Sequence, residues 1–186
     1  ESLFKGCAAL TSFSFREMDS SSVTTMRDLF SGCTSLASVD FTGIDTSSVT
    51  SITTMFNECK ALKTLDLSDF DVTSSLTSSL FFLRNCSGLT TITTPKVIAD
   101  SVSISLFYTF FTGTEEIEEM TSNHQNITLL RKFEIKYIWK NGTQSTTYTL
   151  TPNYYYYGVS DVTIDAAISE DGYAFGGWTR ADSDDL

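Results

Sequence analysis

Four cysteines recur at a nearly constant spacing, and thiols can bind metal ions or pair as disulfides. They are Cys7, Cys33, Cys59 and Cys86, with steps of 26 (7 to 33), 26 (33 to 59) and 27 (59 to 86) residues. A period in this range indicates a stacked repeat, in which equivalent residues of successive strands lie about 5 Å apart. Four sulfur atoms in such a row cannot surround one tetrahedral zinc ion, and parallel side chains do not point at each other as a disulfide requires. The spacing therefore predicts a row of buried free thiols that pack as small hydrophobic groups, with no metal ligand among them.

Two aspartates also occupy the same place in successive units. Asp40 and Asp66 are expected about 5 Å apart, which is close to the carboxylate separation of retaining glycosidases. The strand face of a repeat array is open and flat, so nothing would exclude water or hold a sugar there. A solvated acidic column, or weak cation binding, is the favoured interpretation. The one histidine, His124, lies in a polar segment, and we expect no catalytic residue and no cofactor.

Each repeat unit combines three sequence patterns. Residues 36–41 are a predicted strand, because Val39 and Phe41 alternate with Ser38 and Asp40 and so give the strand one face toward the core. Asp and Ser/Thr residues follow, and these types cap the first turn of helices. Val49, Ile52, Met55 and Phe56 then form one apolar stripe, which predicts a short helix or helical turn. A strand, a turn and a helix in every unit predict an α/β solenoid.

The solvent face of the predicted sheet is the best candidate for ligand binding. A long open surface of equivalent positions suits recognition better than catalysis. Tight protein binding usually relies on Tyr, Trp or Arg anchors, and this face supplies one arginine among short polar side chains. The candidate ligand-binding residues are Arg16, Ser38, Asp40, Thr64, Asp66, Ser68 and Thr91.

Composition excludes several classes of partner. The 186 residues carry a net charge of −11 without a basic patch, which argues against nucleic acid and against anionic membrane surfaces. No apolar run approaches the roughly 18 residues of a membrane span. Because the chain opens directly on a repeat unit, we expect a fragment of a longer protein or a trimmed mature form.

The best-developed unit resembles a known repeat family. The residues that carry the resemblance are 62–71 together with Ser48, Val49, Met55, Phe56 and Cys59. They resemble the BspA-like leucine-rich repeat of bacterial surface proteins, over about residues 3–120. The resemblance implies an α/β leucine-rich-repeat solenoid with parallel strands and short helical turns. It also implies a secreted or surface-anchored protein that adheres to host proteins. We assign residues 1–120 to this part, with four units and a degenerate, polar fifth unit that starts at Phe111 as a cap.

The rest of the chain reads as a linker and a second module. Residues 121–131 are polar and form the expected linker. Residues 132–186 contain strand patterns, the turn Asn141-Gly142 and the run Gly172-Tyr173-Ala174-Phe175-Gly176-Gly177-Trp178. These features resemble the Listeria–Bacteroides repeat, also called the internalin B-repeat. That resemblance implies a small β-grasp-like α+β domain.

The two resemblances imply an extracellular protein, and the residue patterns themselves favour a function without enzymatic activity. The leading hypothesis is adhesion to a host or neighbouring-cell surface protein or glycan through the sheet face. The main alternative is a structural stalk that holds another domain away from the cell. A glycosidase acting through Asp40 and Asp66 is the third and least favoured hypothesis.

Overall fold

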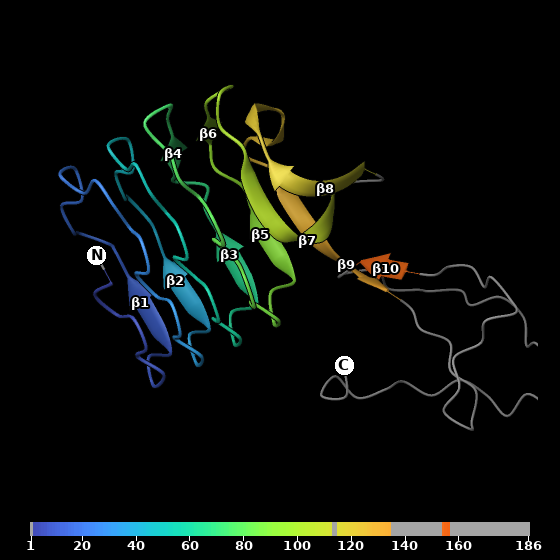
Figure 1. Ribbon diagram of the computed structural model, residues 1–186, viewed down its shortest axis with the longest axis horizontal. Coiled ribbons are helices and arrows are strands. Elements are labelled where there is room, and N and C mark those ends of the chain that lie inside the picture. The colour runs from blue at the N-terminus through green and yellow to red at the C-terminus, as the bar shows by residue number, and fades with distance from the viewer. Residues whose placement is uncertain (1, 113–114, 135–153, 157–186) are drawn as a thin grey trace, which may run out of the picture. The chain divides into compact units, whose positions relative to one another are not determined.

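The fold is known from a computed structural model, which describes residues 2–112, 115–134 and 154–156. The chain divides into two compact units, the second of which begins at Glu134. Nearly all the described residues belong to the first unit, shown in colour in Figure 1. Most of the module predicted for residues 132–186 lies outside the described residues.

Short strands dominate the first unit (Figure 1). One sheet pairs β1 (Ser12–Ser14) with β2 (Ser38–Asp40) in parallel, and another pairs β4 (Asp71–Val72) with β6 (Val97–Ile98) in parallel. The largest sheet has the order β3 (Thr64–Asp66), β5 (Thr91–Thr93), β9 (Thr128–Glu134), β7 (Ile104–Thr112) and β8 (Glu115–Met120). The 3₁₀ helix η1 spans Ser122–His124, and the last strand, β10, spans Tyr154–Tyr156.

The predicted α/β leucine-rich-repeat solenoid is wrong. The described residues contain no α-helix, and their one helical element is the three-residue 3₁₀ helix η1. The strands are divided among separate sheets instead of one continuous sheet. The largest sheet is mixed, because β3 and β5 are parallel whereas β9, β7 and β8 pair in antiparallel fashion. The fold is therefore a nearly all-β arrangement of several sheets.

The segments predicted as helical turns form consecutive β-turns instead. The N–H of Cys33 donates to the carbonyl of Phe30, three residues back, at 3.0 Å. The N–H of Phe30 donates to the backbone carbonyl of Met55, in the next repeat, at 2.9 Å. An α-helix needs bonds four residues back and right-handed φ throughout, but Asp28 and Gly32 have φ of 57° and 77°. Apolar residues three or four apart thus mark successive turns whose buried corners face the core.

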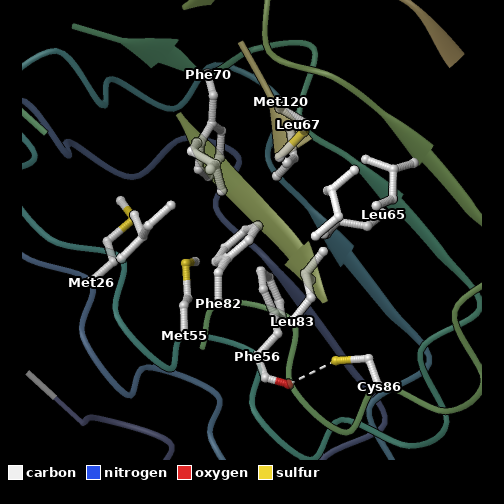
Figure 2. Packing of buried hydrophobic residues seen from close by; sticks show 14 of the residues in the cluster. Met26, Met55, Phe56, Leu65, Leu67, Phe70, Phe82, Leu83, Cys86 and Met120 are labelled. Atoms are coloured by element: carbon white, nitrogen blue, oxygen red, sulfur yellow. Dashed lines mark hydrogen bonds between the residues drawn. The ribbon is translucent and has the colours of Figure 1, made fainter. Parts of the chain in front are cut away.

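The repeat spacing does place equivalent residues side by side. Ser12 pairs with Ser38 across β1 and β2, and Thr64 pairs with Thr91 across β3 and β5. Phe30 is fully buried and stacks on its repeat equivalents Phe4 and Phe56, with ring centroids 5.6 Å apart in both pairs. Figure 2 shows the neighbouring part of this core, where Phe56, Phe82 and several methionines and leucines converge.

The predicted fifth repeat unit has a different structure. β7 and β8 form an antiparallel pair, from Ile104 opposite Met120 to Thr112 opposite Glu115, with a register shift between Ser105 and Phe110. The segment expected to be a linker, 121–131, contains η1 and the first residues of β9. Strand β9 pairs with both β5 and β7, so antiparallel strands continue the sheet that β3 and β5 begin.

Candidate functional site

The predicted ligand-binding residues lie on or directly after the short strands. Ser38 and Asp40 belong to β2, Thr64 and Asp66 to β3, and Thr91 to β5. The remaining two, Arg16 and Ser68, follow β1 and β3 in the chain. All seven are half-buried or exposed. Strands β2 and β3 lie side by side (Figure 1), so the structure brings these residues to neighbouring positions, as predicted.

Asp40, one of the two aspartates of this face, is already bound within the protein. Asp40 accepts hydrogen bonds from the N–H of Thr42 and from Ser14 Oγ, both at 3.0 Å, and Arg16 Nε lies 3.6 Å from its Oδ2. The hydrogen bonds from Thr42 and Ser14 lower the pKa of Asp40 to about 2. The carboxylate therefore stays ionised at neutral pH, and neighbouring donors satisfy both of its oxygens.

Other aspartates of the repeats also serve the local backbone. Asp66 accepts the N–H of Ser68 at 2.9 Å, and Asp45 accepts the N–H of Ser47 at 2.9 Å. Such bonds stabilise turns. A cavity lined by Thr46 and other residues has room for about 10 Å³, enough for a single water molecule. Neither Asp40 nor Asp66 lines it, so it offers no sugar-sized pocket at the predicted carboxylate pair.

The buried cysteines make one repeated contact. The thiols of Cys33, Cys59 and Cys86 donate to the carbonyl of a phenylalanine in the preceding repeat, at 3.0, 3.2 and 3.0 Å. Figure 2 shows the bond from Cys86 to Phe56. Burial raises the pKa of Cys86 to about 12 and also raises that of Cys59. These thiols therefore stay protonated and inert at neutral pH.

Cys7 differs, because the side chain of this first cysteine is exposed. The prediction of buried thiols thus holds for three of the four positions. Within the described ranges, no group of three or more His, Cys, Asp or Glu side chains could hold a metal ion. No helix in the described part of the chain has the length and apolarity to cross a membrane.

The seven predicted ligand-binding residues, which we call the polar strand face, include no aromatic side chain. Exposed aromatic side chains lie on a different part of the surface. Leu80, Phe81 and Phe107 are 64%, 44% and 47% exposed, which is unusual for large hydrophobic residues close together. The rings of Phe81 and Phe107 lie 6.0 Å apart between centroids, at 61°. The guanidinium carbon of Arg84 lies 5.2 Å from the centre of the Phe81 ring. We call these four residues the aromatic–arginine patch.

The backbone of the patch is strained. Phe81 and Phe107 have φ of 57° and 68°, a left-handed conformation that costs a bulky residue roughly 1–2 kcal/mol. In earlier repeats the place of Phe81 is taken by Asp28 and Thr54, which are also left-handed. Their side chains hydrogen-bond to each other at 2.7 Å. Folding alone therefore favours a short polar residue where Phe81 stands.

This patch was not among the binding residues predicted from the sequence. The run Leu80-Phe81-Phe82-Leu83 has the length of a core segment, but only Phe82 and Leu83 are buried. An alignment of the repeats could have indicated that Phe81 is exposed, because it places Phe81 at the position where the other units carry polar residues. No sequence pattern indicated the contact of Phe107 with Phe81, because that contact depends on where β7 runs in the tertiary structure.

Residues 1–123 match the family described as "Mycoplasma protein of unknown function, DUF285". The chain belongs to this family. No curated protein matches the chain. No solved structure matches it either. The DUF285 segment contains the repeats, the patch and strands β1 to β8.

Proposed function

We propose that this DUF285 protein recognises a partner on a host or neighbouring cell without enzymatic activity, and that the aromatic–arginine patch makes the contact. The observation that carries the proposal is the exposure of Phe81 and Phe107 beside Arg84. Aromatic and arginine side chains dominate the binding energy of protein interfaces. The contact would thus lie away from the polar strand face, where the carboxylate of Asp40 is held by Thr42 and Ser14.

The extracellular location in this proposal comes from the sequence resemblances. The repeats resemble the BspA-like leucine-rich repeat, and the C-terminal residues resemble the internalin B-repeat. Both resemblances support a secreted or surface-anchored protein. The net charge of −11 also favours a partner other than nucleic acid.

A structural stalk is the second candidate function. The observation that favours it is the bonding within the polar face, where Asp40 and Asp66 serve neighbouring residues and offer little to a ligand. A stalk needs no saturable partner.

Binding of the fluorescently labelled chain to intact cultured epithelial cells tests both functions. We expect saturable binding that the pair F81N and F107N reduces at least tenfold. The set Arg16→Ala, Asp40→Asn and Asp66→Asn, on the polar face, should leave it within twofold. Binding that never saturates would favour the stalk. Saturable binding that only the polar-face set abolishes would return recognition to the surface predicted from the sequence.

A further inference from the structure

We infer that the aromatic–arginine patch binds a segment of a partner protein in which an apolar side chain stands next to a carboxylate. This inference rests on the proposed function and adds the chemistry of the partner. Three properties of the patch support it: the fold does not need its exposed rings, it carries a cation available for pairing, and its geometry suits a peptide.

The exposed aromatic side chains of the patch are not explained by folding. In the second and third repeats, Asp28 and Thr54 adopt the left-handed turn position and hydrogen-bond to each other. In the fourth repeat Phe81 takes this position, adopts a conformation that bulky residues avoid, and keeps nearly half of its surface in water. Strain of this kind is stored where it serves a function, and an exposed strained ring contributes little to the core.

The patch also carries the positive charge of Arg84. Arg84 is exposed, and within the described part of the chain its guanidinium group lies over the ring of Phe81 without an ion pair. Salt bridges to carboxylates hold five cations of the described residues: Lys5, Arg16, Arg27, Lys96 and Lys132. Arg84 has no salt bridge with a described residue, and among the cations without one it lies against an exposed aromatic ring. An arginine without an ion pair in a protein of net charge −11 is available for an anion of the partner. Arginine suits a carboxylate because its donors match the two oxygens.

The geometry of the patch suits a peptide better than a glycan. Sugars stack on an open, flat aromatic face, but Phe81 has the guanidinium of Arg84 over its ring and Phe107 tilted beside it at 61°. Leu80, 64% exposed, adds aliphatic surface without hydrogen-bonding groups. This combination fits an apolar side chain that packs on the rings while a neighbouring carboxylate meets Arg84.

A second copy of the chain is a poorer occupant. A two-fold contact through the patch would bring two Arg84 side chains toward each other. Each copy also carries a net charge of −11, so the copies repel at low ionic strength.

Two synthetic peptides test the inference: acetyl-Glu-Phe-Leu-Glu-amide and its counterpart with lysine in place of both glutamates. Binding to the full chain is measured by NMR titration in 50 mM salt. We expect the glutamate peptide to bind at least tenfold more tightly than the lysine peptide. Arg84→Gln should remove this preference, and F81N should weaken both peptides. Met18→Asn, which alters an exposed apolar residue of the first repeat, is the matched control and should change neither affinity.

Several outcomes would overturn the inference. Equal affinity for the two peptides would remove the role of Arg84, and so would a preference that survives R84Q. Tighter binding of sialyllactose than of the glutamate peptide would assign the patch to a glycan. A dimer in sedimentation that F81N dissociates would assign it to a second copy. If F81N and F107N abolish cell binding while the glutamate peptide shows no preference, the inference fails and the proposed function stands. If the peptide binds as expected but cells do not bind the chain, the proposed function fails instead.

Discussion

The cysteine of each repeat illustrates how one side chain joins neighbouring units. The carbonyl of Phe30 accepts the N–H of Cys33 within its own turn and the thiol of Cys59 from the next repeat. The side chain of Cys59 is fully buried, and its sulfur fills space that a smaller residue would leave empty. A cysteine at this position therefore combines packing with a weak hydrogen bond between units.

Replacing Cys59 with alanine should lower the free energy of unfolding by about 1–3 kcal/mol. The loss comes mainly from the cavity, because Phe30 keeps its bond to the N–H of Cys33. Cys7→Ala is the matched control, since Cys7 is exposed, and its effect should stay within about 0.5 kcal/mol. Urea unfolding measures both variants, and equal effects would contradict the role of the buried thiol.

At the scale of elements, consecutive turns set how closely the repeats approach. The turn after Cys86 brings Gly88 N to 3.1 Å from the carbonyl of Lys60 in the preceding repeat. A Cβ atom on Gly88 would lie 2.4 Å from that oxygen, which is closer than real contacts allow. The oxygen that this Cβ atom would meet belongs to the backbone of Lys60, so no side chain can move away to relieve the overlap.

Gly88→Ala should therefore destabilise the fold by about 1–3 kcal/mol, because the two repeats must separate locally. The equivalent place in the second repeat, two residues after its cysteine, is held by the exposed Ser35. Ser35→Ala serves as the control and should be nearly neutral. Thermal unfolding distinguishes the two, and a Gly88→Ala protein as stable as the parent would show that the repeats have room to spare.

At the scale of the whole molecule, two sets of titrating groups limit the pH range in which the fold is most stable. Hydrogen bonds lower the pKa of the aspartates Asp19, Asp40 and Asp45, while burial raises the pKa of the thiols of Cys59 and Cys86. Folding thus favours the charged form of the acids and the neutral form of the thiols. The stability they contribute is greatest between the two titration ranges.

The free energy of unfolding should consequently fall at both ends of the pH scale. On the acid side, the contribution of Asp40 is complete above 3.8, the ordinary pKa of an aspartate, and is lost as the pH falls toward 2. On the alkaline side, the contribution of Cys86 is complete below 9.0, the ordinary pKa of a thiol, and is lost as the pH rises toward 12. Urea unfolding across this range checks both limbs. Asp40→Asn should flatten the acid limb, and Cys86→Val the alkaline one.

The sequence by itself determined which residues become neighbours across the repeats. The 26-residue period correctly predicted that Ser12 meets Ser38, and the 27-residue step that Thr64 meets Thr91. It also identified Cys33 and Phe56 as core positions. These features follow from local alternation and from a repeated length, both of which are written along the chain.

Only the tertiary structure decided the rest. An apolar spacing of three to four residues predicts a helix, but in this chain it belongs to a row of β-turns. Backbone hydrogen bonds between repeats, such as the one from the N–H of Phe30 to the carbonyl of Met55, stabilise the turns in place of helices. The fold is therefore nearly all-β and not the predicted α/β. The contact between Phe81 and Phe107 likewise joins a turn of the fourth repeat to β7. The sequence could not foresee it, because an exposed contact between unlike elements leaves no periodic trace.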